Sequence, residues 1–217
     1  MSEELSPRVD TTENTYIDLG ADTLEGYAIA KTSRQLAREA IGDKTPEDRI
    51  RQRCSVAVGD FTMADLMRFE HDPITAGVAA IRDGAPIYTD IRMVQVGILK
   101  RGHTCTVECA LDYGADIAAA KEITRTSAGF CALGETLSGS IVVIGNAPSA
   151  LLSICKMIEE GIVPALVIGT PVGFVNAAES KELLRTMPVP SVSNFGTRGG
   201  TPIAVASMNE IITISLK

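Results

Sequence analysis

The chain has no tryptophan, only two histidines among its 217 residues, and few aromatic side chains of any kind (4%). It also lacks an excess of positive charge, because its formal net charge is -7. A nucleic-acid partner is therefore not expected, since neutralising phosphates requires a basic face. No apolar run reaches the roughly 18 residues that a membrane-spanning helix needs, so we expect no membrane association.

The first 20 residues are polar and acidic, and they lack the apolar stretch of a signal peptide. We therefore expect a polar N-terminal leader over residues 1–20, followed by one domain over residues 21–217. The absence of a signal peptide indicates a cytoplasmic protein.

The five cysteines form an odd set without a paired spacing. In the cytoplasm such cysteines are expected as free thiols rather than disulfides. Cys105 and Cys109 are separated by three residues, but the second half of a zinc-binding pattern is absent. We expect no metal site made of protein side chains.

Apolar segments alternate with helix-compatible segments through the second half of the chain. Ile141–Ile144 and Val163–Ile168 each end in a glycine-containing turn, and a helix-compatible segment follows each turn. This alternation is typical of parallel strands that are buried on both faces. Further strands are expected at 87–89, 106–111 and 189–194, and helices at 22–41, 46–58, 62–67, 73–83, 115–136 and 202–215. The predicted fold class is α/β, a single three-layer α/β/α sandwich with a mainly parallel, flavodoxin-like sheet.

Two turns are expected at the carboxyl ends of these strands, where α/β sheets bind their ligands. They are Gly145-Asn146-Ala147-Pro148 and Gly169-Thr170-Pro171-Val172-Gly173-Phe174. The helices behind them would direct N–H groups toward an anionic ligand. On spacing alone, these turns are equally well explained as tight strand-to-helix connections.

The residue strings themselves carry more information than the spacing. Gly-Asn-Ala-Pro at 145–148, followed by Gly-Thr-Pro-Val-Gly-Phe and Ala-Ala-Glu-Ser-Lys up to residue 181, closely resembles the precorrin-8X methylmutase family of cobalamin biosynthesis. The resemblance extends to three other blocks, at 84–98, 124–128 and 198–200. Together these blocks cover most of the chain from about residue 24 to its end.

The resemblance implies an isomerase that moves a methyl group between neighbouring carbons of a tetrapyrrole, converting precorrin-8X, or its cobalt-containing counterpart, to hydrogenobyrinic acid or the cobalt-containing equivalent. It implies no external cofactor, with cobalt present only as part of the substrate, and it implies a homodimer. The substrate has an apolar ring and carboxylate arms. Arginine suits such arms because its guanidinium binds carboxylates through two parallel hydrogen bonds.

The resemblance also assigns site residues. Arg125, in the Thr-Arg-Thr-Ser block, matches the family's active-site arginine and is the expected catalytic residue. Arg53 matches a substrate-binding arginine. Arg92 is expected at the substrate, or as an ion-pair partner of Asp90 or Glu179. The other expected substrate-binding positions are Gly26, Asp90, Gly145, Asn146, Ala147, Pro148, Thr170, Pro171, Val172, Gly173, Phe174 and Arg198.

Val56 departs from the family pattern, because the family carries its proton-transferring histidine at this position. Valine cannot move a proton. Neither His71 nor His103 lies in a matching motif, and Cys54 and Ser55 reach the site only if the helix is rotated. Gly26 is a second departure, since the family has a serine there.

Two functions remain open: a methylmutase that works without this histidine, and a non-catalytic relative that binds a corrinoid. A nucleotide-binding enzyme is not supported, because neither the phosphate-binding loop nor the dinucleotide-binding string is present.

Overall fold

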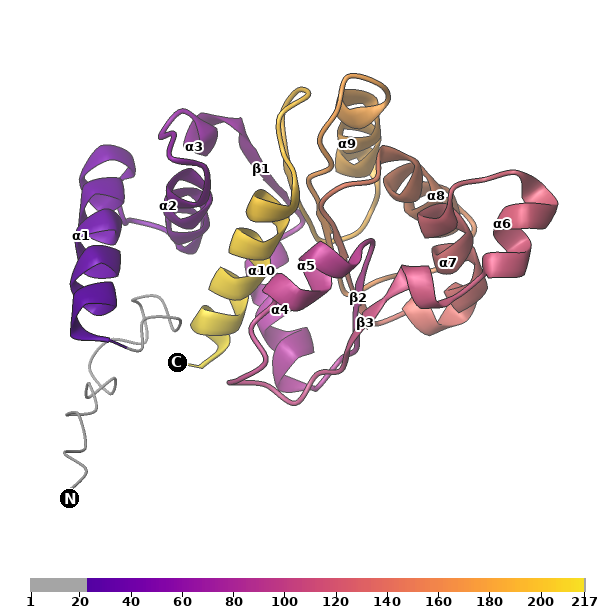
Figure 1. Ribbon diagram of the computed structural model, residues 1–217, viewed down its shortest axis with the longest axis horizontal. Helices are drawn as coiled ribbons and strands as arrows, with labels where there is room; N and C mark the ends of the chain where they lie inside the picture. The colour runs from indigo at the N-terminus through magenta and orange to yellow at the C-terminus, as the bar shows by residue number, and fades with distance from the viewer. Residues whose placement is uncertain (1–22, 217) are drawn as a thin grey trace, which may run out of the picture.

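A computed structural model describes residues 23–216 (Figure 1). The predicted leader, residues 1–20, lies outside the described residues. The centre is a six-stranded sheet in the order β1-β6-β5-β4-β2-β3. The strands are β1 (Met67–Glu70), β2 (Ile87–Thr89), β3 (Val107–Cys109), β4 (Ile141–Ile144), β5 (Leu166–Gly169) and β6 (Ser191–Asn194). All neighbouring strands are parallel except β1, which runs antiparallel to β6.

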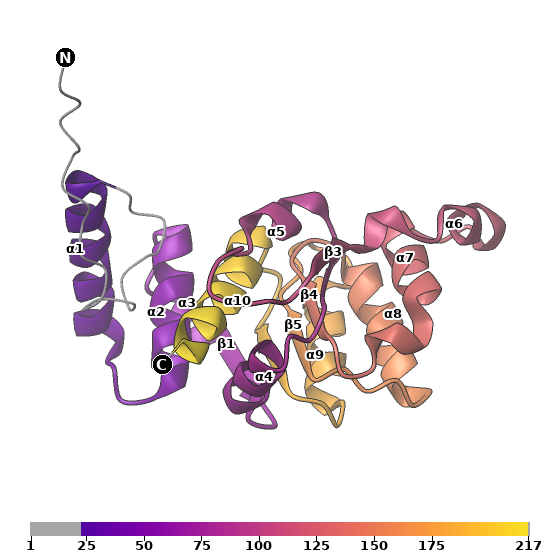
Figure 2. The same cartoon turned by 90° about the horizontal axis from the view of Figure 1, so that it is seen from below.

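Helices cover both faces of the sheet, as Figure 2 shows. The α-helices are α1 (Leu24–Ile41), α2 (Pro46–Val58), α3 (Met63–Leu66), α4 (Pro73–Arg82), α5 (Arg92–Gly97), α6 (Ala115–Lys121), α7 (Arg125–Leu133), α8 (Pro148–Glu159), α9 (Ala177–Thr186) and α10 (Thr201–Ser215). Two 3₁₀ turns are also present, η1 (Ala110–Asp112) and η2 (Gly134–Leu137).

The side chains of β4 show how the two cores form. Ile141 and Val143 pack with α4, α5 and α10 on one face, whereas Val142 and Ile144 pack with α7, α8 and α9 on the other. Because successive side chains of a strand point to opposite faces, a continuous β-branched run fills two cores at once. The predicted three-layer α/β sandwich with a mainly parallel sheet is confirmed.

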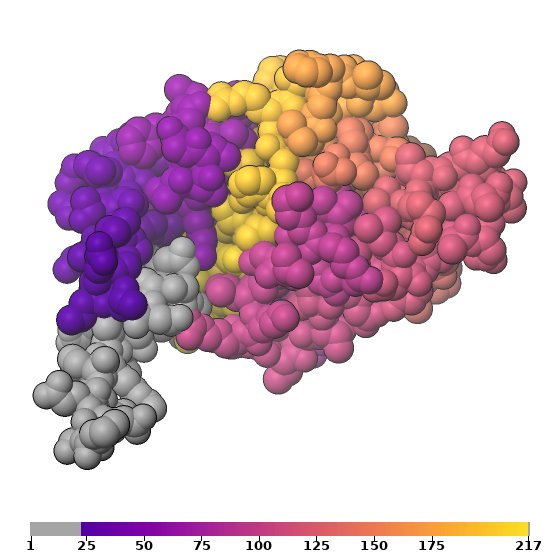
Figure 3. All heavy atoms as spheres, viewed as in Figure 1, coloured from indigo at the N-terminus to yellow at the C-terminus, as the bar shows by residue number. Residues whose placement is uncertain are grey.

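Two helices extend the molecule beyond the sandwich. α2 packs between α10 and α1, so that α1 lies at one end of the molecule and α6 at the other (Figures 1 and 3). The start of α2 is set locally, since the Thr45 hydroxyl accepts from the Asp48 N–H while the Asp48 carboxylate accepts from the Thr45 N–H. Gly59 then ends the helix in a left-handed conformation.

The antiparallel edge strand β1 was not predicted. The helix expected over 62–67 ends at Leu66, and Met67 already pairs with Asn194 of β6. His71 and Asp72 both have positive φ angles, 57° and 51°, where the chain passes from β1 into α4. The helical segments expected over 115–136 are α6, α7 and η2, whereas β5 begins at Leu166 rather than at Val163.

Candidate functional site

The five parallel strands end along one side of the sheet, which we call the carboxyl edge. The segments that follow β2, β3, β4, β5 and β6 meet there, and they contain most of the predicted site residues. This is where the strand-to-helix alternation placed them. The side chains are organised differently from the sequence-based expectation in several places.

Asp90 follows β2 at this edge, and its buried carboxylate binds the turn after β4. It accepts hydrogen bonds from the N–H groups of Gly145 (3.2 Å), Asn146 (2.7 Å) and Ala147 (2.9 Å). Burial raises the pKa of the Asp90 carboxyl above its ordinary value, and these hydrogen bonds offset part of the rise. The expectation that these three N–H groups face a substrate carboxylate is therefore wrong, since they already have an acceptor in Asp90.

Arg92 and Arg125 converge on the segment after β3. The Arg92 guanidinium forms an ion pair with Asp112, so the expected alternative partners, Asp90 and Glu179, are not the ones that the structure shows. Arg125 Nη2 donates to the carbonyl of Leu111 at 3.1 Å. Both arginines are exposed at the carboxyl edge. The two guanidiniums thus contact consecutive residues, Leu111 and Asp112, and both are accessible to an anionic ligand.

The start of α7 is joined to the start of α8. Thr124 caps α7 by accepting from the Ser127 N–H, and its hydroxyl lies 2.9 Å from the hydroxyl of Ser149. Ser149 directly follows Pro148 of the turn after β4. This contact places Arg125 beside that turn, as expected for parts of one site.

The segment after β5 and the segment after β6 support each other. The Gly200 N–H donates to the Thr170 carbonyl at 2.7 Å, and the Gly173 N–H donates to the Thr197 carbonyl at 3.1 Å. Pro171 is buried, so the expectation that it contacts the substrate is not met in this structure. Phe174, in contrast, is 95% exposed, and Val172 is also exposed. These two side chains offer apolar surface at the carboxyl edge.

Lys181 of α9 is a buried residue of this region to which the sequence analysis assigned no role. Its Nζ donates to the Arg198 carbonyl at 2.6 Å and lies 3.4 Å from Asn194 Oδ1. Burial, with a smaller contribution from the charge of Arg185, lowers the pKa of the Lys181 ammonium to about 8. Lys181 therefore holds the segment after β6, and its place in the Ala-Ala-Glu-Ser-Lys string was the available signal.

The Arg198 side chain turns away from this segment toward the loop after α2. It forms an ion pair with Asp60 and donates to the Thr62 hydroxyl at 3.2 Å. The Thr62 hydroxyl, together with the Arg198 guanidinium, lowers the pKa of Asp60 to about 2. Arg198 thus connects the carboxyl edge to the α2 region.

Val56 and Arg53 of α2 line a cavity of about 380 Å³ on that side of the molecule. Its other lining residues come from α2, α10 and the end of α5, and most of them are apolar: Ala57, Gly97, Leu99, Pro202, Val205, Ala206 and Asn209. A volume of this size lies within the usual range of small-molecule sites, roughly 300–1,000 Å³. Val56, where the motif comparison expects the family's histidine, thus lies on a cavity wall next to an arginine.

A second, smaller cavity of about 100 Å³ lies on the α1 side of Val56. It is lined by Arg53 and Val56 from α2 and by three residues of α1, which are Ala30, Ser33 and Arg34. Gly26 lies four residues before Ala30, so it shares the same helix face one turn earlier. A serine at this position, as the motif comparison expects for the family, would therefore lie on the same side of α1.

The groups considered as substitutes for the histidine do not line either cavity. His71 and His103 lie in loops at the opposite edge of the sheet, before α4 and before β3. Cys54 is fully buried against Ser207, and burial raises the pKa of its thiol to about 12. Ser55 is buried as well. Cys54 therefore stays neutral at physiological pH.

The five cysteines are all free thiols, as predicted. Within residues 23–216, no group of three or more histidine, cysteine or acidic side chains is placed to hold a metal ion. In the same part of the chain, no helix has both the length and the apolar character needed to cross a membrane.

Comparisons with known proteins agree with the motifs. The family profile described as "CbiC: Precorrin-8X methylmutase" matches residues 28–214. A cobalt-precorrin-8 methylmutase of Methanocaldococcus jannaschii is 39% identical over 204 residues, which cover 89% of this chain and 96% of the relative. A precorrin-8X methylmutase of Pseudomonas aeruginosa is also 39% identical, over 87% of this chain and 96% of the relative.

A longer relative shows the same similarity over part of its length. It is the cobalamin biosynthesis protein CbiHC of Archaeoglobus fulgidus, 41% identical over 89% of this chain, and this chain spans 41% of it. Among solved structures, precorrin-8X methylmutase from Thermus thermophilus has a TM-score of 0.80 at 34% identity, covering 87% of this chain and 96% of that one. The fold, the motifs and these similarities agree, and the chain belongs to the precorrin-8X methylmutase family.

Proposed function

We propose that this protein is an isomerase of cobalamin biosynthesis that moves a methyl group between adjacent carbons of precorrin-8X or cobalt-precorrin-8. The observation that carries the proposal is the family match over residues 28–214. Two relatives support it, one named for cobalt-precorrin-8 and one for precorrin-8X, and each is 39% identical to this chain. For that reason the two substrates have to be tested side by side.

Substrate binding in this proposal divides between carboxylate arms and ring. The exposed guanidiniums of Arg92 and Arg125 bind arms at the carboxyl edge, because charge-assisted hydrogen bonds to carboxylates are strong and directional. Val172 and Phe174, which are exposed at the same edge of the sheet, cover part of the apolar ring. Asp90 acts indirectly, by holding the turn at 145–148 in place.

The reaction proceeds in this proposal without an external cofactor, since an isomerisation neither oxidises nor reduces its substrate. With Val56 on the cavity wall, proton transfer by a histidine at this position is not available. Losing a general acid typically costs about 10²–10⁴-fold in rate. Substrate orientation then supplies the remaining acceleration.

We further propose that the protein works as a homodimer in the cytoplasm. α1 supports the dimer, because it packs on α2 and leaves Ile29 (60%) and Leu36 (53%) exposed, seven residues apart on one face of the helix. An apolar helix face of this kind is typical of a surface that another chain covers. The free thiols are consistent with a reducing compartment.

The direct test is to identify the product. Purified protein is mixed with each substrate, and the product is analysed by mass spectrometry and by NMR of a ¹³C-labelled migrating methyl group. An isomerase gives a product of unchanged mass in which the labelled methyl carbon has a new neighbour. A change in mass, or a label that stays in place, would contradict the proposal.

A further inference from the structure

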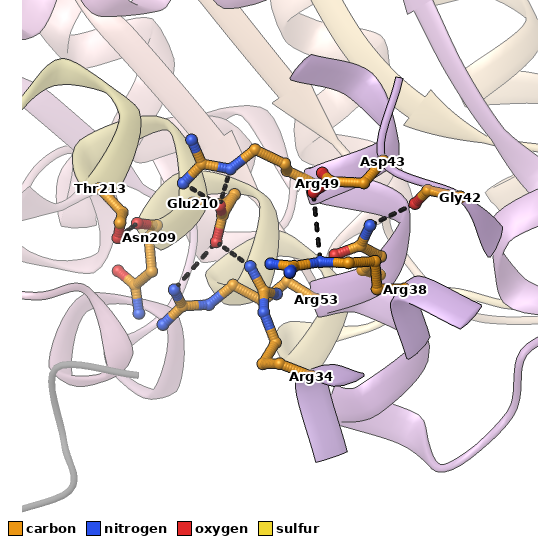
Figure 4. A network of polar contacts seen from close by, with 10 residues as sticks. Arg34, Arg38, Gly42, Asp43, Arg49, Arg53, Asn209, Glu210 and Thr213 are labelled. Carbon is orange, nitrogen blue, oxygen red and sulfur yellow. Dashed lines mark hydrogen bonds and ion pairs between the residues drawn. The ribbon is translucent and has the colours of Figure 1, made fainter. Parts of the chain in front are cut away.

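Glu210 is the single ionisable residue of α10, and it is fully buried. Its carboxylate contacts three guanidiniums from two other helices (Figure 4). Arg34 Nη2 of α1 lies at 3.0 Å, Arg49 Nε of α2 at 2.8 Å and Arg53 Nη1 of α2 at 3.1 Å. One carboxylate thus gathers three positive charges at the junction of α1, α2 and α10.

Two of these three arginines also face the cavities beside Val56. Arg53 lines both cavities, and Arg34 lines the smaller one. Arg49 shares the same carboxylate but is among the lining residues of neither cavity. The carboxylate of Glu210 therefore sits directly behind cationic groups on the wall of the candidate site.

The physical consequence is orientation of these two side chains. An unanchored arginine has many rotamers, and fixing it costs conformational entropy when a ligand binds. Hydrogen bonds to a buried carboxylate fix the guanidinium before the ligand arrives. Glu210 also separates three like charges, which would repel one another in a low-dielectric region without it.

We propose that Glu210 is a positioning residue for substrate binding: it holds Arg53 and Arg34 toward the cavities beside Val56, where they bind a carboxylate arm of the tetrapyrrole. This inference rests on the proposed function for the identity of the ligand. It assigns a binding role to Arg34 and a positioning role to Glu210. Neither residue belongs to the motifs by which the chain resembles its family.

The test measures binding of hydrogenobyrinic acid by absorbance titration, separately from turnover. Glu210→Gln keeps the shape of the side chain but removes its charge. We expect the dissociation constant to rise about 10- to 100-fold, as for loss of a hydrogen bond to a charged group. Arg53→Gln is expected to have an effect of similar size. Because Glu210 acts through both Arg53 and Arg34, adding Glu210→Gln to the double variant Arg34→Gln/Arg53→Gln is expected to weaken binding no further.

Arg49→Gln is the matched control, because it removes a guanidinium from the same carboxylate without altering the cavity lining. It is expected to lower thermal stability and to leave the dissociation constant within about twofold. Equal weakening of binding by Arg49→Gln and Arg53→Gln would show that the cluster is merely structural and would overturn the inference. If Glu210→Gln does not fold, Glu210→Asp is compared with the same variants, and the same criteria apply.

Failure of the positioning role and failure of the proposed function give different results. Unchanged binding by a folded Glu210 variant would overturn the positioning role and leave the proposed isomerase untouched. Weakened binding by that variant, together with no methyl migration by the unmodified protein, would support the positioning role and contradict the isomerase.

Discussion

Arg125 is the side chain on which the proposed chemistry depends most at the scale of single residues. Arg125→Ala is expected to lower kcat/KM about 10- to 100-fold, because an exposed guanidinium at the carboxyl edge is lost. Thermal stability should change little, as is usual for exposed positions. Steady-state kinetics and thermal unfolding check both expectations. Lys121→Ala, on neighbouring α6, is the control, and a kcat/KM for Arg125→Ala equal to the control's would remove Arg125 from the mechanism.

Val56 offers the complementary experiment, in which chemistry is restored. Val56→His places an imidazole on the cavity wall next to Arg53. We expect kcat to rise and to acquire a pH dependence around the ordinary histidine pKa of about 6.5. Val58→His, near the end of the same helix and outside the cavity lining, serves as the control. A pH–rate profile for Val56→His that matches the control's would contradict a role for this position in proton transfer.

The lowered pKa of Lys181 makes the stability of the folded protein depend on pH. Its folded-state pKa of about 8 lies below the ordinary value of 10.5, so the folded protein binds fewer protons than the unfolded chain between these two values. The free energy of unfolding should therefore rise as pH increases from about 8 to 10.5. Denaturant titrations of the wild type and of Lys181→Met across this window test the sign, and the rise should be absent from the variant. An equal slope in both proteins would contradict a perturbed lysine.

The loops at the carboxyl edge show, at the scale of elements, where backbone geometry limits the sequence. Gly199 has a φ of 153°, and a Cβ there would lie 2.4 Å from the Thr170 carbonyl oxygen. Gly196, in the same loop, also has a positive φ but has open space around it. The two glycines therefore separate the effect of a clash from the effect of backbone strain.

Gly199→Ala is accordingly expected to destabilise the protein more than Gly196→Ala does. Gly196→Ala adds strain at a left-handed position, about 1 kcal/mol, whereas Gly199→Ala adds a steric clash with the segment after β5. Thermal unfolding of both variants gives the comparison. Equal losses of stability would mean that the segments after β5 and after β6 pack less closely than the hydrogen bond between Gly200 and Thr170 indicates.

Elements with strong local signals could be predicted from the sequence. The Thr45-Pro46 cap set the start of α2, and the β-branched run at 141–144 identified a strand buried on both faces. β1 could not be predicted, because Met67–Glu70 has no distinct pattern and becomes a strand only by pairing with β6. Local signals identify elements, whereas pairing depends on distant parts of the chain.

The same distinction explains what was missed in the candidate site. The turns at 145–148 and 169–174 were correctly placed at the carboxyl edge, since parallel strands impose that position. The partner of the 145–148 turn, Asp90, depends on the packing of β2 against β4. Glu210 did carry a signal that went unused, because it is the single charged residue within α10.

At the scale of the whole molecule, α1 and α2 form a lobe beside the α/β sandwich (Figure 1), and Ile29 and Leu36 of α1 are exposed. We expect a particle of about twice the 22.9 kDa chain mass in size-exclusion chromatography with light scattering. Leu36→Glu is expected to shift it toward the monomer, whereas Glu39→Gln on the same helix should not. A monomeric wild type would contradict the proposed dimer.

The central claim is that this chain moves a methyl group although Val56 stands where the motifs place the family's histidine. The most direct measurement follows the absorbance spectrum as purified protein meets precorrin-8X and cobalt-precorrin-8 under single-turnover conditions, beside a protein-free control. We expect the spectrum of the corrin product to appear faster than in the control with at least one substrate. A tetrapyrrole that binds but keeps its original spectrum would contradict the claim and identify a binding protein in its place.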